Sequence, residues 1–254
     1  METNKIYNEN CLDTMARMPD NFVDLTVTSP PYDNLRDYKG YSFDFESIAK
    51  ELYRITKEGG VVVWVVGDET QDGSESGTSF RQALYFKETG FNLHDTMIYS
   101  KNGFRFPFPN RYHQVFEYMF IFSKGKPKTF NPIKDKPNKH IDYSERMKRE
   151  KDGSKTFRKA FMAEEFGKRY NIWQYAIGGD KGVDHPATFP EKLAEDHILS
   201  WSNEGDLVYD PFMGSGTTAK MAMNNKRNYI GSEISKEYCD IAENRLSKQT
   251  KVLL

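Results

Sequence analysis

Two short apolar runs constrain the fold of this chain most. The runs FVDLTVT at residues 22–28 and VVVWVV at residues 61–66 are rich in β-branched residues, and a segment with helical spacing of apolar residues, 44–57, separates them. Strands that read as nearly continuous apolar stretches are buried on both faces, which is typical of parallel sheets covered by helices. The sequence therefore predicts a βαβ unit in the N-terminal third of the chain.

A second unit of the same kind is predicted near the C-terminus. Residues 206–210 and 228–234 read as strands, and residues 217–225 read as the helix between them. Further predicted elements are helices at residues 80–91, 190–201 and 236–248 and strands at residues 94–101 and 116–125. Together these patterns predict an α/β fold with a mostly parallel, twisted sheet and helices on both faces.

The middle of the chain is basic and weakly periodic. Residues 124–169 hold 15 Lys and Arg against 7 Asp and Glu, which leaves 21 against 30 for the rest of the chain. Such segregated charge indicates either a face that meets a polyanion or a solvated loop. We predict an insertion outside the sheet, with a short helix near residues 157–170. The predicted organisation is the first half of one domain at residues 1–123, the insertion at 124–180 and the second half of the same domain at 181–254.

Several function classes find no support. The longest apolar run is far shorter than the ~20 residues that span a bilayer, and the N-terminus lacks the regions of a signal peptide, so we expect a cytoplasmic location. Cys11 and Cys239 are too few for a disulfide framework and read as small buried residues. The five histidines show no ligand spacing, so no metal site is expected.

A glycine loop follows the strand predicted at residues 206–210. Gly214 and Gly216 lie between this strand and a helix, and the acidic Glu233 ends the next strand, 17 positions beyond Gly216. An acid at about this interval, roughly 20 residues, binds ribose hydroxyls in nucleoside sites. Because the loop has neither a third glycine nor a phosphate-binding lysine, S-adenosylmethionine fits better than a pyrophosphate cofactor.

A stiff corner follows the other buried strand. In TSPPYDNL the adjacent Pro30 and Pro31 can continue neither strand nor helix, because proline fixes φ and has no N–H to donate. The corner and the glycine loop both come after strands predicted to be parallel, and ligands bind at the carboxyl ends of such strands. We therefore expect the two corners to lie side by side.

The residues at these corners resemble motifs of one enzyme family. TSPPY at residues 28–32 resembles motif IV of the DNA amino-methyltransferases, which use S-adenosylmethionine to methylate N4 of cytosine or N6 of adenine. DPFMGSGTT at 210–218 resembles their motif I, residues 185–212 resemble motif X, and residues 116–125 resemble motif VIII. The motif order, with a basic insertion between the catalytic and cofactor motifs, is similar to that of the β group.

This resemblance implies a fold, a partner and a role for each site residue. The fold is a Rossmann-like methyltransferase domain, the partner is double-stranded DNA with the target base flipped out, and the insertion recognises the target. Ser29 and the carbonyl of Pro30 accept hydrogen bonds from the exocyclic amine, Pro31 stiffens the corner, and Tyr32 stacks on the base. The implied cofactor-binding residues are Asp210, Phe212, Gly214, Ser215, Gly216 and Glu233, with Phe189 and Pro190 closing over the methionine portion.

The serine of SPPY favours N4 of cytosine, since relatives that act on N6 of adenine more often carry aspartate or asparagine there. Adenine N6 stays open as the alternative, and a non-catalytic nucleic-acid-binding protein or a protein-glutamine methyltransferase is a more distant one. A nicotinamide dehydrogenase would leave the prolines unexplained. The resemblance is also compatible with a homodimer and with a separate cognate restriction endonuclease in a restriction-modification system.

Overall fold

A computed structural model describes residues 1–31, 43–104, 109–138, 146–158, 164–176 and 190–250. The chain forms two compact units. The larger unit comprises Met1–Asn131 and Asn171–Leu254, and the smaller unit comprises Pro132–Tyr170. The domain boundaries at residues 123 and 180 stay a prediction.

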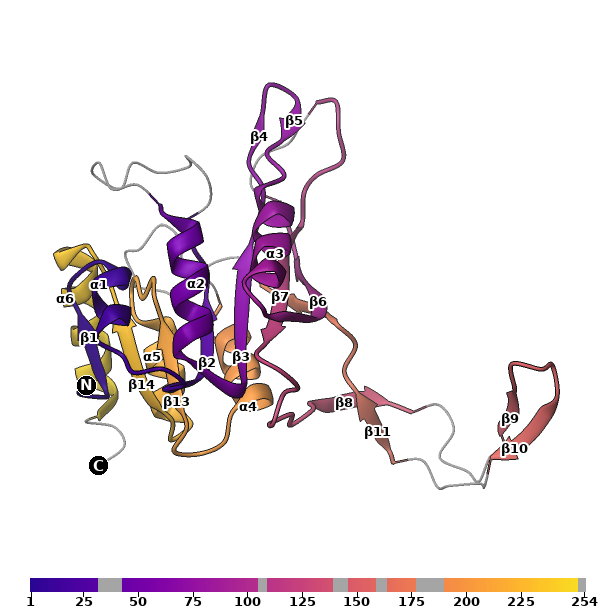
Figure 1. The fold of residues 1–254 in the computed structure, drawn as a ribbon. Helices are drawn as coiled ribbons and strands as arrows, with labels where there is room; N and C mark the ends of the chain where they lie inside the picture. Colours follow the sequence, from indigo (N-terminus) through magenta and orange to yellow (C-terminus); the bar gives the residue numbers. More distant parts are fainter. Residues whose placement is uncertain (32–42, 105–108, 139–145, 159–163, 177–189, 251–254) are drawn as a thin grey trace. The chain divides into compact units, whose positions relative to one another are not determined.

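An eight-stranded sheet forms the centre of the larger unit (Figure 1). Its strands, in spatial order, are β1 (Lys5–Tyr7), β14 (Asn228–Ser232), β13 (Leu207–Asp210), β2 (Val23–Thr28), β3 (Thr56–Val66), β7 (Phe116–Ser123), β6 (Asn92–Lys101) and β12 (Ile172–Tyr175). All neighbours pair in parallel except β3 with β7 and β7 with β6, which are antiparallel. The predicted mostly parallel sheet is confirmed.

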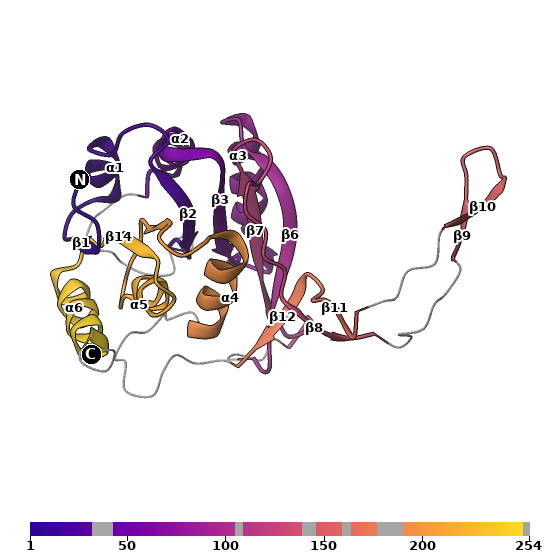
Figure 2. The same ribbon diagram turned by 90° about the horizontal axis from the view of Figure 1, so that it is seen from below.

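Helices cover both faces of this sheet (Figure 2). On one face α2 (Phe45–Ile55) contacts α1 (Cys11–Ala16) and α3 (Thr78–Glu88), and on the other α5 (Thr217–Asn224) contacts α4 (Glu191–Trp201) and α6 (Lys236–Thr250). The two-faced arrangement explains why β2, β3 and β13 read as nearly continuous apolar runs. Within the described ranges, none of the helices has the length and apolar character needed to cross a membrane.

Helix α2 shows how local sequence sets one of these elements. Asp44 caps its start by accepting a hydrogen bond from the Ser47 N–H at 3.2 Å, and Ile48 and Leu52 are buried on one face. The helix ends at Ile55, earlier than the predicted residue 57, because Thr56 already has extended backbone and starts β3.

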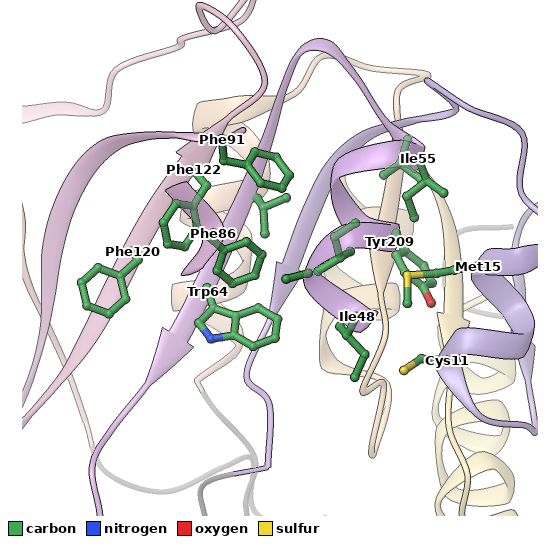
Figure 3. Close-up of a cluster of buried hydrophobic side chains, with 14 of the residues drawn as sticks. Cys11, Met15, Ile48, Ile55, Trp64, Phe86, Phe91, Phe120, Phe122 and Tyr209 are labelled. Atoms are coloured by element: carbon green, nitrogen blue, oxygen red, sulfur yellow. The ribbon is translucent and has the colours of Figure 1, made fainter. Parts of the chain in front are cut away.

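The core on the face of α1, α2 and α3 combines aliphatic side chains with a group of aromatic rings (Figure 3). The ring of Phe86 stacks on that of Phe122 with centroids 4.5 Å apart and meets Trp64 edge-on at 5.1 Å. The buried indole Nε1 of Trp64 donates to Gln82 at 2.9 Å, so its polar atom is satisfied. Trp64 is also 6.1 Å from Phe212 between ring centroids, which joins this core to the glycine loop.

The smaller unit consists of two antiparallel ribbons. Strand β8 (Lys134–Pro137) pairs with β11 (Phe166–Lys168), and β9 (Arg146–Arg149) pairs with β10 (Lys155–Arg158). The helix predicted near residues 157–170 is therefore wrong for the described residues of that range. A similar short hairpin, β4 (Thr70–Gln71) with β5 (Ser74–Glu75), forms in the larger unit.

One segment of the predicted insertion belongs to the main sheet. Strand β12 lies within residues 124–180 yet pairs in parallel with β6, so the prediction that this range stays outside the sheet is wrong here. Its only buried side chain is Trp173, whereas Ile172 is 62% exposed. A four-residue strand with one buried side chain is too short to show a recognisable alternation of apolar and polar residues.

Candidate functional site

The serine-proline corner and the glycine loop follow two adjacent strands. Strands β2 and β13 pair in parallel, with Thr26 opposite Tyr209, so their carboxyl ends meet at one edge of the sheet. The chain leaves β2 through α2 to β3 on one side and leaves β13 through α5 to β14 on the other. Strand order therefore reverses between β2 and β13, which is where open α/β sheets bind ligands. The prediction that the two corners lie together is confirmed.

A buried hydrogen bond ties these corners to each other. Thr28, the last residue of β2, donates its hydroxyl to Oδ1 of Asp210, the last residue of β13, at 2.6 Å. The same oxygen accepts the backbone N–H of Phe212 at 3.0 Å. Burial raises the pKa of the Asp210 carboxyl to about 6, while hydrogen bonds from Thr28 and Thr218 oppose that shift. Asp210 thus anchors the first turn of the glycine loop to β2, the strand that precedes Ser29.

Helix α6 packs closely against the glycine loop. Gly214 and Gly216 have φ values of +52° and +82°, which favour glycine. A Cβ on Gly216 would be 2.9 Å from the Cβ of Ala242 in α6, a distance too short for real Cβ atoms. Both the conformation and the space therefore require glycine at position 216. Ser215, between the two glycines, is buried.

Glu233 lies against this loop, as its interval from Gly216 predicts. Its carboxylate accepts the N–H of Gly214 through Oε2 and the N–H of Ser235 through Oε1, each at 2.8 Å. The backbone N–H of Glu233 donates in turn to the carbonyl of Tyr7 in β1 at 3.0 Å. Burial raises the pKa of Glu233, and these N–H donors limit the rise. An ionised carboxylate has about four acceptor positions, so Glu233 retains capacity for ligand hydroxyls.

Three charged side chains also hold the glycine loop, and we call them the ionic bracket: Arg245, Glu191 and Lys220. Arg245 of α6 donates to the carbonyl of Ser215 at 3.2 Å and to the hydroxyl of Thr217 at 3.1 Å, and it forms an ion pair with Glu191. Lys220 of α5 forms an ion pair with the same carboxylate at 2.5 Å. Side-chain exposures of 11% and 12% for Arg245 and Lys220 leave little solvent to screen these charges. Sequence reasoning missed this bracket, because no local pattern brings residues 191, 220 and 245 together.

The structure describes most of the remaining predicted site residues. Ser29 and Pro31 are half-buried and Pro30 is buried, directly after β2. Pro190 is the N-cap of α4 instead of its first helical residue, and it leads into Glu191 of the ionic bracket. Phe212 is half-buried and contacts the ring of Phe43 at 5.7 Å. Tyr32 and Phe189 lie outside the described residues.

Neither cysteine is suited to act as a nucleophile. Cys11 and Cys239 are buried and form no disulfide, and the thiol of Cys239 donates a hydrogen bond to the carbonyl of Glu233 at 3.5 Å. Burial raises the pKa of each thiol to about 12. A thiol with such a pKa stays protonated at neutral pH and is a poor nucleophile. Within the described ranges, no three His, Cys, Asp or Glu side chains gather to hold a metal ion. The site offers hydrogen-bond acceptors, a glycine loop and an acid.

Several known proteins that are similar to this chain in sequence or in fold are named as DNA methylases or methyltransferases. The family model described as DNA methylase, for N6 and N4 amino groups, matches residues 23–244. The orphan methyltransferase M.BamHII of Bacillus amyloliquefaciens is 66% identical over 234 residues, which cover 88% of each chain. Among solved structures, the cytosine-N4-specific PvuII DNA methyltransferase has a TM-score of 0.71 at 22% identity, covering 96% of this chain and 86% of its own. The S-adenosylmethionine complex of a putative DNA modification methylase from Thermus thermophilus has a TM-score of 0.65 at 24% identity and covers 96% and 95%. These two structures show the fold.

Proposed function

This chain belongs to the DNA methylase family, and from that premise we propose that it transfers a methyl group from S-adenosylmethionine to N4 of cytosine in double-stranded DNA. Family membership makes it a DNA amino-methyltransferase; the target base and the residue roles are the proposal. The observation that carries it is the 2.6 Å hydrogen bond between Thr28 and Asp210. This bond holds the serine-proline corner, with its amine acceptors, against the start of the glycine loop.

The residues around the loop fit S-adenosylmethionine. The carboxylate of Glu233 can accept ribose hydroxyls, and the sharp turns at Gly214 and Gly216 let a ligand approach the loop backbone. Asp210, Phe212 and Ser215 complete the predicted cofactor lining, and Phe189 and Pro190 cover the methionine portion. When bound, the cofactor supplies a methyl group on a positively charged sulfur.

The serine-proline corner prepares the amine that is methylated. An exocyclic amine is a weak nucleophile because its lone pair is delocalised into the ring. The Oγ of Ser29 and the carbonyl of Pro30 accept its two N–H groups, which opposes that delocalisation and directs the lone pair at the methyl group. Pro31 fixes the backbone that aims these acceptors, since proline restricts both its own φ and the preceding residue. Tyr32 stacks on the flipped base.

The choice of cytosine rests on Ser29. A neutral hydroxyl at this position is more frequent in enzymes that act on N4 of cytosine, whereas an acid or amide is more frequent in those that act on N6 of adenine. Adenine N6 is the alternative, because its amine presents the same pair of N–H groups to the same acceptors. A nucleoside assay separates the two.

The test is product analysis with a labelled cofactor. The protein is incubated with unmethylated plasmid DNA and S-adenosylmethionine labelled in its methyl group, and the DNA is digested to nucleosides and separated. We expect the label in N4-methylcytosine. Label in N6-methyladenine would refute the cytosine assignment, and DNA without label would refute the proposed activity.

A pair of serine variants tests the assigned role of the corner. We expect Ser29→Ala to abolish transfer while the affinity for S-adenosylmethionine, measured by calorimetry, stays unchanged. Ser247→Ala is the control, because Ser247 is exposed on α6 and bonds only to the carbonyl of Asn244 within the described chain. Full activity in Ser29→Ala would show that its hydroxyl is not an acceptor in catalysis.

The partners and location form a separate part of the proposal. As further parts of the proposal, the protein acts in the cytoplasm, and the basic insertion at residues 124–180 contacts the duplex. A homodimer and a cognate restriction endonuclease as a separate protein are further proposed partners. The relative M.BamHII is named an orphan methyltransferase, which favours the opposite alternative, an enzyme without such an endonuclease. Light scattering after gel filtration tests the dimer.

A further inference from the structure

The two ribbons of the smaller unit differ in charge. The ribbon of β9 and β10 with its turn, residues 146–158, has six Lys and Arg against two acids, a net charge of +4. The described segments that carry β8 and β11, residues 132–138 and 164–170, have four Lys and Arg against three acids, a net charge of +1. The positive charge of this unit is therefore concentrated on the β9–β10 ribbon.

The cations around the β8–β11 ribbon have partners within it. Lys134 pairs with Glu164 at 2.5 Å, and Arg169 forms an ion pair with Asp135. The ammonium of Lys136 lies 3.7 Å from the ring centroid of Tyr170. Each of these three cations therefore has a partner within the smaller unit.

The β9–β10 ribbon presents two different faces. Directly opposite residues of an antiparallel pair share a face, and successive residues alternate. Lys148 and Thr156 are opposite each other, and both bond to Glu150, at 2.8 Å each, so this face is internally neutralised. Arg149 and Lys155 are opposite each other on the other face.

The face of Arg149 and Lys155 has no neutralising acid in the described part of the chain. Of the ribbon's two acids, Glu150 bonds to the opposite face, and Asp152 accepts hydrogen bonds from the N–H and hydroxyl of Ser154 at 2.9 and 2.7 Å. Like charges directly across a strand pair destabilise it, and an isolated two-stranded hairpin is only marginally stable. An external partner that accepts hydrogen bonds from both cations would remove this cost.

We propose that this ribbon enters the major groove of the target DNA and that Arg149 and Lys155 recognise base edges there; the inference rests on the proposed function. A two-stranded ribbon fits the major groove, about 12 Å wide, but not the minor groove, about 6 Å wide. Arg and Lys donate to O6 and N7 of guanine in that groove. Met147, 59% exposed and two positions from Arg149 on the same face, offers an apolar contact for a thymine methyl group.

The test compares sequence preference in matched variants. Unmethylated plasmid DNA is treated with the wild type, Arg149→Gln or Lys155→Gln, and the sequences around methylated bases are read. We expect each variant to lose preference at one position of the recognised sequence and to lower kcat/KM on that sequence about 5- to 150-fold, the range that one bidentate base contact provides. Lys5→Gln is the control, because Lys5 lies outside residues 124–180 and forms an exposed ion pair with Glu2, and we expect it to change kcat/KM by no more than about twofold.

The alternative outcomes separate base contacts from phosphate contacts. A uniform loss on all sequences, with unchanged preference and a salt dependence of binding reduced by about one charge, would show phosphate contacts and overturn the inference. Unchanged rates and preference in Arg149→Gln and Lys155→Gln would overturn it too, while leaving the proposed function intact. If the wild type methylates no DNA, the proposed function fails. In that case the inference is tested by binding alone, and equal binding of a random duplex by the wild type and both variants would overturn it. Unchanged affinity for S-adenosylmethionine verifies that each variant is folded.

Discussion

Replacing Gly216 by alanine measures how tightly the glycine loop is held against α6. The left-handed φ of +82° costs an alanine about 1–2 kcal/mol. The new Cβ, 2.9 Å from the Cβ of Ala242, adds an overpacking cost of about 1–3 kcal/mol. We therefore expect Gly216→Ala to lower the free energy of unfolding by about 2–5 kcal/mol. It should also weaken S-adenosylmethionine binding, because the loop or α6 must move.

Gly205 provides a matched control for the backbone part of this cost. Its φ is +85°, nearly that of Gly216, but no atom lies within 4 Å of a Cβ built there. Gly205→Ala should lose only the conformational cost of about 1–2 kcal/mol and should bind the cofactor normally. Adding Ala242→Gly to Gly216→Ala should recover the overpacking cost, after subtraction of the effect of Ala242→Gly alone.

Urea unfolding followed by circular dichroism gives the stabilities, and calorimetry gives the cofactor affinities. The decisive comparison is between the two glycine variants. Equal losses of stability in Gly216→Ala and Gly205→Ala would refute the packing argument, as would a thermodynamic cycle with Ala242→Gly that shows no coupling.

Three further predictions concern residues that hold the site together. Asp210 has a folded pKa of about 6, above its ordinary value, so its contribution to stability is complete below about pH 4 and is lost as the pH rises through 6, by about 3 kcal/mol. Asp210→Asn should remove this pH dependence. Urea unfolding of both proteins between pH 4 and 7 measures it, and an equal change of stability with pH in the two proteins would contradict the prediction. Thr28→Val, which keeps the shape but removes the donor to Asp210, should cost about 1–3 kcal/mol of stability and reduce kcat; unchanged values would mean that the bond does not hold the corner. Arg245→Met should raise KM for S-adenosylmethionine far more than KM for DNA, with partial recovery in Arg245→Lys; an equal rise in both constants would argue against a positioning role for the ionic bracket.

The parts of the site that sequence predicts are those with local causes. Strands β2 and β13 are short apolar runs that stop at proline or at a glycine loop, and both facts are visible in a few residues. The acid Glu233 follows from its interval after the loop. The meeting of the two corners follows from a general rule, because parallel strands present their carboxyl ends at one edge.

What sequence does not predict depends on long-range packing. Arg245 looks like an ordinary residue of an amphipathic C-terminal helix, and only the position of α6 against the loop brings it to Ser215. Strand β12 buries a single side chain, Trp173, and derives its conformation from pairing with β6. The ribbons of the smaller unit replace a predicted helix, because cross-strand pairing outweighs weak local periodicity.

The pairing of β2 with β13 also determines when the newly made chain can complete its site. Thr26 and Tyr209, opposite each other in the sheet, are 183 positions apart. At about 5–20 residues per second, a ribosome needs about 10–40 s after making β2 to deliver its neighbour. During that interval one side of β2 has no partner strand, and the serine-proline corner has no Asp210 to hold it. Catalytic competence therefore appears only after β13 and the glycine loop have been made and β13 has paired with β2.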